Sequence, residues 1–267
     1  MTSFPQEASD LLSPLRELAK LPAFPPVLGQ PVRSAATLLL VRDGPVNEGL
    51  QVMALQRSSS LRSFAGFYAF PGGKLAPVDQ KLAETFCFGQ VAAETAENAA
   101  FAVAAIRETA EEIGWLVAIS AFAGDTADRL LSQDEQTSLL EDEQTLPRLL
   151  QSDKKLIHLS QLRFVGRWIG PHSQPATFDT RFYITFWRGG NEPVRVMAEE
   201  TAAAHWVSPK RLIEAIGAGR LLAAPPTLAM LEGLSQYSNA SRCAATLSVP
   251  DPSLNPSQMN PQERNQI

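Results

Sequence analysis

One acidic turn constrains this chain more than any other feature. Residues 107–114 read Arg-Glu-Thr-Ala-Glu-Glu-Ile-Gly, at the end of an alanine-rich run that predicts a helix over about 97–113 with Gly114 as its left-handed cap. On that helix Glu108 shares a face with Glu111 and Glu112, where like charges cost about 0.2–0.5 kcal/mol per pair. A helix C-terminus is also unfavourable for anions. A bound divalent cation would offset both costs, since Mg²⁺ takes carboxylate oxygens; the alternative is a solvated acidic face.

A glycine turn upstream strengthens the interpretation as a metal site. Residues 70–74 read Phe-Pro-Gly-Gly-Lys, and Arg107 precedes Glu111 by four residues, so that its guanidinium can hold that carboxylate. Together the turn and the helix resemble the Nudix box, which reads Gly-x5-Glu-x7-Arg-Glu-U-x-Glu-Glu-x-Gly-U, where U is a bulky apolar residue. Gly73 matches the first glycine, residues 107–114 match the second half, and Trp115 fills the last U position.

The chain departs from this box in three ways. Gly73 and Arg107 lie 34 positions apart (107 − 73), where the box pattern places them 14 apart. The glutamate in the middle of the box has no clear counterpart, because counting forward from Gly73 reaches Asp79 and counting back from Arg107 reaches Ala99. Thr109 replaces a bulky apolar residue. We expect the extra residues, about 77–96, to form a loop or short helix, as in the split box of coenzyme A diphosphatases of the mammalian peroxisomal type; such an insertion costs little entropy.

The resemblance implies a set of catalytic and metal-binding residues. Arg107, Glu108, Glu111 and Glu112 would be catalytic, and the three glutamates would bind Mg²⁺ or Mn²⁺, with one carboxylate acting as general base. In the family a further glutamate ligand often precedes a Trp-Val strand. Glu199 and Glu200 are the candidates here, and we take Glu200; a solvated acidic pair is the alternative.

The segment before the box bears on the substrate. It is similar to a motif of coenzyme A-hydrolysing Nudix proteins at Arg57, Ser58, Arg62, Gly66 and residues 70–73. The resemblance therefore implies substrate contacts from Arg57, Arg62, Gly72 and Gly73. The two arginines would offer forked donors to the phosphates of coenzyme A, or else they are exposed and form weak surface ion pairs. Further along, Asp179 and Arg181 are candidates to pair with each other.

The implied activity is hydrolysis of coenzyme A or acyl-coenzyme A to 3′,5′-ADP and (acyl-)phosphopantetheine. One alternative is a pyrophosphatase for another nucleoside diphosphate derivative, such as ADP-ribose, a sugar nucleotide or a dinucleoside polyphosphate. Another is a catalytically silent Nudix ligand sensor. The missing glutamate in the middle of the box favours the sensor, and the intact Glu108, Glu111 and Glu112 oppose it.

The order of elements indicates an α/β or α+β protein. Strands are predicted at 34–42, 50–56, 116–122, 163–169, 181–188 and 205–207, and helices at 8–20, 210–216 and 225–236. The resemblance implies an α/β/α sandwich with a mixed sheet and an insertion in the box at about 77–96. The acidic, leucine-bearing residues at about 127–151 predict one or two extra helices outside the minimal fold. We divide the chain into a helix and proline-rich lead-in (1–31), the Nudix domain (32–238) and a polar tail expected to be disordered (239–267).

Composition argues against two kinds of partner, and the resemblance alone implies a small-molecule nucleoside diphosphate substrate of the coenzyme A class. A net charge of −5 argues against a general nucleic-acid binder, and no apolar run is long enough to span a membrane. The first residues lack the features of a signal peptide, and the two cysteines are read as free thiols in a reducing cytoplasm. A homodimer is expected by family analogy alone.

Overall fold

A mixed β-sheet forms the middle layer of the protein. The computed structural model describes residues 32–45, 48–61, 64–121, 126–170, 177–190, 193–197 and 200–249. Within them the sheet has the order β12-β3-β2-β1-β10-β9, with β11 paired to β2 and β4 paired to β1. Its central strands β1 (Val32–Asp43) and β10 (Thr177–Phe186) are parallel. The strands β2 (Leu50–Arg57), β4 (Gly72–Lys74), β9 (Arg163–Gly170) and β11 (Thr201–Val207) are antiparallel to their partners, and the short β3 (Phe67–Ala69) and β12 (Leu222–Ala223) complete one edge.

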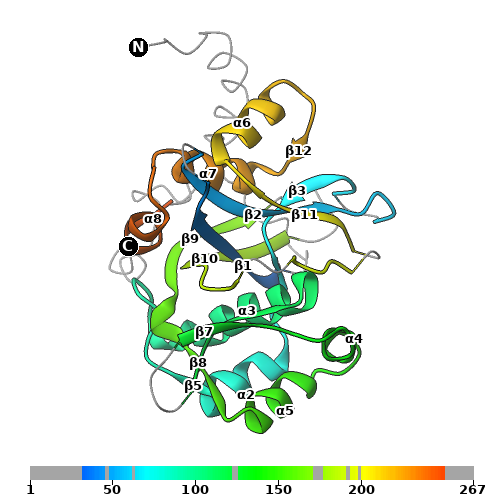
Figure 1. The fold of residues 1–267 in the computed structure, drawn as a ribbon, viewed down its shortest axis with the longest axis vertical. Coiled ribbons are helices and arrows are strands. Elements are labelled where there is room, and N and C mark those ends of the chain that lie inside the picture. The colour runs from blue at the N-terminus through cyan, green and yellow to red at the C-terminus, as the bar shows by residue number, and fades with distance from the viewer. Residues whose placement is uncertain are drawn as a thin grey trace.

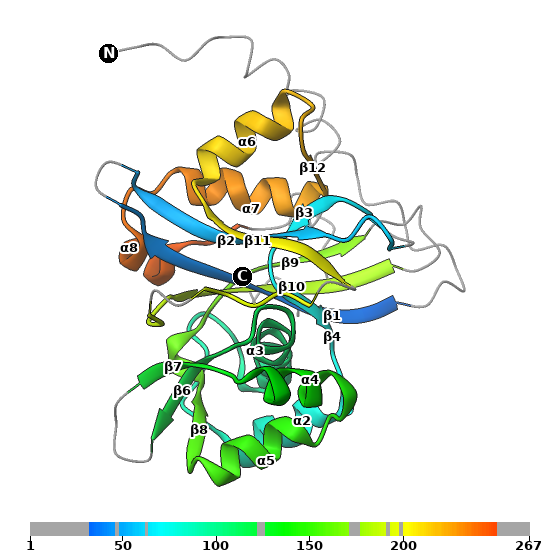
Figure 2. The same cartoon turned by 45° about the vertical axis from the view of Figure 1, so that its right-hand side comes forward.

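Helices cover both faces of this sheet (Figures 1 and 2). On one face lie α6 (Pro209–Gly217), α7 (Pro225–Ser235) and α8 (Ala240–Thr246), and on the other lies α3 (Ala99–Ile113). Successive side chains of β1 point to opposite faces, so Leu38 packs in the core beneath α3 while Leu39 packs in the core beneath α7. The α/β/α sandwich with a mixed sheet is therefore confirmed.

Helix α3 carries the acidic turn. Most of its alanines are buried, Ala102 and Ala105 fully, and their small side chains let the helix pack against β1 and β4. A 3₁₀ turn (Ala96–Asn98) precedes it, so the helix begins two residues later than predicted. It ends at Gly114, whose φ of 73° is the left-handed cap that was predicted.

The box insertion and the segment after α3 build a smaller layer below α3 (Figure 2). The insertion forms the predicted short helix, α2 (Pro77–Thr85), and then β5 (Cys87–Phe88). β5 belongs to a second sheet of order β5-β8-β6-β7, with β6 (Trp115–Ala121), β7 (Thr126–Leu130) and β8 (Lys155–His158).

The segment predicted as helical at about 127–151 is only partly so. It contains α4 (Gln133–Glu141) and α5 (Thr145–Ser152), but its first residues form strand β7. Two sets of contacts stabilise the strand. It pairs with β6, and the carboxylate of Asp128 accepts hydrogen bonds from the backbone N–H groups of Ala118 and Arg188, at 3.1 and 2.7 Å. These partners are distant in sequence, so local periodicity could not reveal them.

The prediction of a polar, disordered tail from residue 239 is wrong for the first residues of that segment. Asn239 caps α8 by accepting the N–H of Arg242, and Ala240, Cys243 and Leu247 are buried at helical spacing against the sheet. The polar composition concealed this short apolar stripe. The predicted N-terminal helix at 8–20 and residues 250–267 lie outside the described residues.

The described residues contain neither a reactive thiol nor a membrane-spanning helix. Cys87 and Cys243 are free, and burial raises the pKa of each thiol to about 12. Both are therefore poor nucleophiles. No helix in the part of the chain that the structure describes is long and apolar enough to cross a membrane.

Candidate active site

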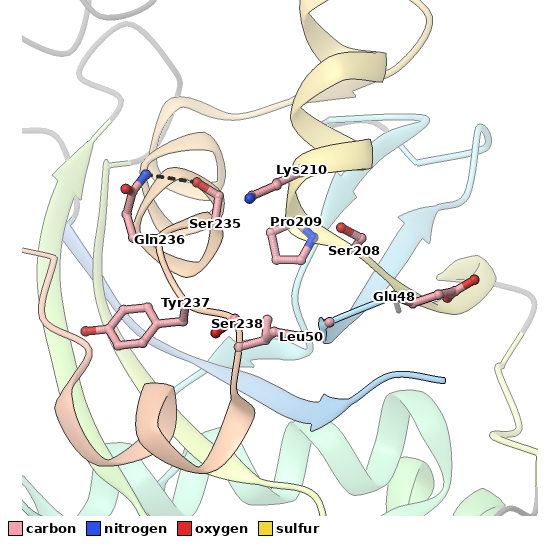
Figure 3. A pocket seen from close by; sticks show the side chains of 10 residues that line it. Glu48, Leu50, Ser208, Pro209, Lys210, Ser235, Gln236, Tyr237 and Ser238 are labelled. Atoms are coloured by element: carbon pink, nitrogen blue, oxygen red, sulfur yellow. Dashed lines mark hydrogen bonds between the residues drawn. The ribbon is translucent and has the colours of Figure 1, made fainter. Parts of the chain in front are cut away.

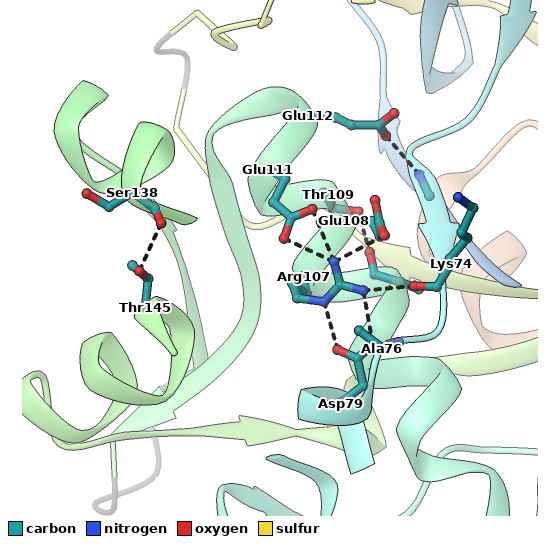
Figure 4. Close-up of polar contacts among 12 residues, drawn as sticks. Lys74, Ala76, Asp79, Arg107, Glu108, Thr109, Glu111, Glu112, Ser138 and Thr145 are labelled. Carbon is teal, nitrogen blue, oxygen red and sulfur yellow. Dashed lines mark hydrogen bonds and ion pairs between the residues drawn. The ribbon is translucent and has the colours of Figure 1, made fainter. Parts of the chain in front are cut away.

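The acidic end of α3 lies directly against the glycine turn. Strand β4 pairs with β1, and the N–H of Gly72 donates to Oε2 of Glu112 at 2.9 Å (Figure 4). A Cβ atom on Gly73 would lie only 2.3–2.5 Å from the carboxylate atoms of Glu108. A Cβ atom on Gly72 would instead lie 2.4 Å from the backbone carbonyl oxygen of Ala36 on β1, so the turn needs glycine at both positions. The two halves of the sequence motif, 34 positions apart (107 − 73), form one site.

Arg107 anchors this site from beneath. Its side chain is buried, and its Nη1 donates to Oε1 of Glu108 at 3.1 Å and to both carboxylate oxygens of Glu111 at 3.0 and 3.1 Å. Its Nη2 donates to the backbone carbonyl of Lys74 at 2.9 Å, which ties the acidic helix to β4 (Figure 4). One guanidinium therefore orients two carboxylates and the glycine turn together.

Strands β2 and β11 supply the next wall of the site. Arg57, at the end of β2, pairs in register with Thr201, and the N–H of Ser58 donates to the carbonyl of Glu200 at 2.9 Å. The charge of Arg57 acts on Glu112, and its buried Nε atom has no hydrogen-bond partner among the described residues. The predicted residues Arg57 and Glu200 are therefore brought to the same site as Glu112. Arg62 and Glu199 lie outside the described residues.

Burial raises the pKa of all three glutamates on α3. The pKa of Glu111 rises from 4.5 to about 7, that of Glu108 rises, and that of Glu112 rises well above its ordinary value. Arg107 opposes the rise for Glu108 and Glu111, whereas mutual repulsion adds to it, and the charge of Glu200 acts on Glu108 and Glu112. Such a cluster is costly unless protons or a cation neutralise it.

The donor set fits a hard divalent cation. Glu108, Glu111, Glu112 and Glu200 offer only carboxylate oxygens, the ligands that Mg²⁺ and Mn²⁺ prefer, and they repel one another in a partly buried site. In the part of the chain that the structure describes, no group of three or more acidic, histidine or cysteine side chains is gathered tightly enough to hold a metal ion as it stands. Carboxylate oxygens of Glu108 and Glu111 accept hydrogen bonds from Arg107.

A solved structure of high similarity decides the family. The crystal structure of a NUDIX hydrolase from Alicyclobacillus acidocaldarius is 38% identical and superposes with a TM-score of 0.78, covering 83% of this chain and 99% of that one. The chain belongs to the Nudix hydrolase family. The curated Caenorhabditis elegans protein named "Putative nudix hydrolase 7" is 24% identical over 212 residues, which are 79% of this chain. The match spans 63% of the length of that relative, and no protein-family model matches the chain.

The Nudix box of this chain has a mid-box carboxylate that sequence reasoning missed. Asp79 is fully buried on α2, and its two oxygens accept hydrogen bonds from Nε and Nη2 of Arg107 at 2.8 and 3.0 Å (Figure 4). It also accepts the N–H of Ala76 at 2.8 Å, which caps α2. Counting forward from Gly73 reaches this residue, but counting back from Arg107 reaches Ala99, so spacing alone does not single out Asp79.

Asp179 and Arg181 do not pair with each other as predicted. Asp179 accepts two hydrogen bonds from Arg167 on the adjacent strand, at 2.7 and 2.8 Å. Arg181 instead donates to Oδ1 of Asn98 at 2.6 Å and lies over the ring of Phe101. Asp179 and Arg181 lie on the same face of β10, but Asp179 finds its partner on β9, whereas Arg181 finds its partners at Asn98 and on α3.

A separate pocket of about 390 Å³ lies beside α6 and α7 (Figure 3). Its lining includes Glu48, Ser208, Lys210, Ser235 and Tyr237. It shares no residue with the acidic end of α3. The chemistry of the Nudix box is therefore not located there.

The raised pKa of Glu111 makes stability depend on pH. Between its ordinary pKa of 4.5 and about 7, the folded chain holds a proton that the unfolded chain has lost, so the free energy of unfolding falls as pH rises through this window. Without metal, we expect Tm to fall by roughly 5 °C from about pH 5 to about pH 8. Mn²⁺ at the higher pH should restore it, because a ligand of the folded state stabilises that state.

Differential scanning fluorimetry of wild type and Glu111→Gln checks this expectation. The variant should show a shallower fall, since the glutamine does not titrate. Glu94, whose pKa burial also raises to about 7, remains in both proteins and cancels in the comparison. An equal slope in the two proteins would contradict the role given to Glu111.

Proposed function

We propose that this chain hydrolyses a diphosphate linkage in a nucleoside diphosphate derivative, using Mg²⁺ or Mn²⁺, and that its substrate is coenzyme A or acyl-coenzyme A. The products would be 3′,5′-ADP and (acyl-)phosphopantetheine. The observation that carries the proposal is the cluster of Glu108, Glu111 and Glu112, oriented by Arg107 against the glycine turn. A divalent ion bound there would neutralise charge on the diphosphate and lower the pKa of the attacking water.

The residues of the chain have distinct tasks in this proposal. Glu108, Glu111, Glu112 and Glu200 supply the anionic oxygens that attract the cation. Arg107 holds Glu108 and Glu111 in place through its hydrogen bonds and is itself held by Asp79. Gly73 leaves room for the carboxylate of Glu108, and Gly72 lets the turn approach the backbone of β1 closely.

Arg57 supports the coenzyme A class in particular. It is one of the residues that match the motif of coenzyme A-hydrolysing Nudix proteins. Its buried Nε is a donor without a partner among the described residues. A buried donor of this kind costs energy unless a ligand completes it. A phosphate oxygen of coenzyme A is such an acceptor, and Arg62 would supply a second donor.

The alternatives differ in what they would hydrolyse. A silent ligand sensor was favoured by the missing mid-box carboxylate, and that support is lost because Asp79 holds Arg107. Product release from coenzyme A, ADP-ribose and diadenosine polyphosphates, each with Mg²⁺ or Mn²⁺, separates the remaining readings. If none of these substrates releases a product, the proposal is overturned. Cytoplasmic location and a homodimer stay predictions.

Arg57→Ala is expected to weaken binding of coenzyme A. A charge-assisted hydrogen bond contributes about 1.5–3 kcal/mol, so KM should rise about 10–100-fold with a smaller change in kcat. Steady-state kinetics on coenzyme A and on dephospho-coenzyme A would show whether the 3′-phosphate or the diphosphate is contacted. Arg42→Ala is the matched control, because Arg42 lies at the other end of the same sheet, over the ring of Trp206. An unchanged KM for both substrates in Arg57→Ala would contradict the assignment.

A further inference from the structure

A residue outside the Nudix box reaches the end of the acidic helix. Gln136, on α4, is fully buried, and its Nε2 donates to the backbone carbonyl of Glu111 at 2.8 Å and to that of Arg195 at 3.0 Å. The last carbonyls of a helix lack partners within the helix. Gln136 supplies one at the residue whose side chain faces Arg107. A Cβ atom on Gly114 would lie 2.8 Å from its Oε1, so the helix cap also leaves room for it.

Arg195 completes this contact from the segment before β11. Its N–H donates to the carbonyl of Ile113 at 3.1 Å, and its Nη1 donates to Oε1 of Gln136 at 3.2 Å and to the carbonyl of Leu131 at 3.1 Å. Both polar ends of the Gln136 amide are therefore satisfied. Gln136 and Arg195 together join three pieces of chain: α4, the C-terminus of α3, and the segment at 193–197.

That segment leads directly to Glu200. The carbonyl of Met197 accepts the N–H of Glu200 at 3.2 Å and that of Thr201 at 3.0 Å. The carbonyl of Glu200 is held in turn by Ser58. The carboxylate of Glu200 lies close enough to Glu108 and Glu112 to act electrostatically on both. Hydrogen bonds therefore connect the end of α3 to the segment at 193–197, and that segment to Glu200.

We propose that Gln136 and Arg195 form a latch, a pair of positioning residues that sets Glu200 against Glu108 and Glu112 and so determines the affinity of the site for a divalent cation. This rests on the proposed metal-dependent function. It gives α4 a role, because α4 brings Gln136 to the end of the acidic helix. The latch touches no substrate and acts through backbone groups. Partners that orient metal ligands typically change metal affinity by about 10–100-fold when they are removed.

The test is Mn²⁺ binding by the full-length protein, followed by electron paramagnetic resonance without substrate. Gln136→Met keeps the length of the side chain but removes its hydrogen bonds, and should raise the Kd for Mn²⁺ at least 10-fold. The Mn²⁺ concentration for half-maximal activity should rise in parallel, with kcat at saturating Mn²⁺ within about 3-fold of wild type, because the ligands remain. Gln136 is fully buried, so Arg195→Met, at a half-buried position, is the second variant.

Two controls separate positioning from a general loss of stability. Thr145→Val removes the hydrogen bond from Thr145 to the carbonyl of Ser138, 2.9 Å, which joins α5 to α4 (Figure 4). It should lower Tm without changing the Kd for Mn²⁺. In a Glu200→Gln background, Gln136→Met should cause no further loss of Mn²⁺ affinity, since both act through one ligand.

Additive losses in that cycle, or an equal change in Kd for Thr145→Val, would overturn the latch. So would an unchanged Kd in both Gln136→Met and Arg195→Met. These outcomes leave the proposed function intact. Wild-type protein that binds Mn²⁺ but hydrolyses no diphosphate would contradict the proposed function and leave the latch standing. Wild-type protein that binds no Mn²⁺ would overturn both.

Discussion

Glu112→Gln is expected to lower kcat about 1000-fold, by analogy with the loss of a single preorganised charge-stabilising group, while the fold survives. Glutamine can still accept the N–H of Gly72, which lies 2.9 Å from the carboxylate, so the contact between α3 and the glycine turn remains. The variant replaces a group whose charged form is disfavoured at this site, since burial raises the pKa of Glu112 well above its ordinary value. Metal-free Tm should therefore stay equal or rise.

Steady-state kinetics with coenzyme A and Mn²⁺, together with Tm measured without metal, check both halves of this expectation. Glu84→Gln is the matched control, since Glu84 is an exposed glutamate on α2 whose carboxylate accepts a hydrogen bond from Gln80. That variant should retain wild-type turnover. If Glu112→Gln kept full activity, the role of the acidic cluster in catalysis would be wrong.

The parts of the site that the sequence predicted share a local origin. Glu108, Glu111 and Glu112 lie on one turn of one helix, so helical spacing places them together without reference to the rest of the chain. Gly114 ends the helix for an equally local reason, since its φ of 73° favours glycine. The contact between this helix and the glycine turn came only from the family resemblance, because 34 positions (107 − 73) separate Gly73 from Arg107.

The parts that the sequence did not reveal depend on tertiary packing. Gln136 and Arg195 hold the end of α3 from segments 22 and 81 positions after Gly114 (136 − 114 and 195 − 114), and nothing in their local sequence marks them. Strand β7 and helix α8 were missed for a related reason. Each is stabilised by contacts with distant segments. In α8, for example, the N–H of Ala240 donates a hydrogen bond to the carboxylate of Asp43. Tertiary contacts override local composition in both cases.

Asp79 makes both a local contact, at the start of α2, and a tertiary contact, with Arg107. Of the substitutions considered, its removal should lower the free energy of unfolding most. Asp79→Ala leaves the buried guanidinium of Arg107 without its paired acceptor, at 2.8 and 3.0 Å, and removes the acceptor that caps α2 at Ala76. Breaking a buried ion pair on one side costs about 3–5 kcal/mol. We expect a loss of that size in the free energy of unfolding, measured by urea denaturation.

Activity should fall with it, for a reason that can be separated from stability. Arg107 orients Glu108 and Glu111, and without Asp79 its remaining hydrogen bonds to described residues are those to the two carboxylates and to the carbonyl of Lys74. Asp79→Asn is the informative companion, because an amide oxygen can still accept one hydrogen bond from Arg107 while the charge is lost. It should be less destabilised than Asp79→Ala. If Asp79→Ala cost less than about 1 kcal/mol, the value of an ordinary exposed pair, Asp79 would not anchor Arg107.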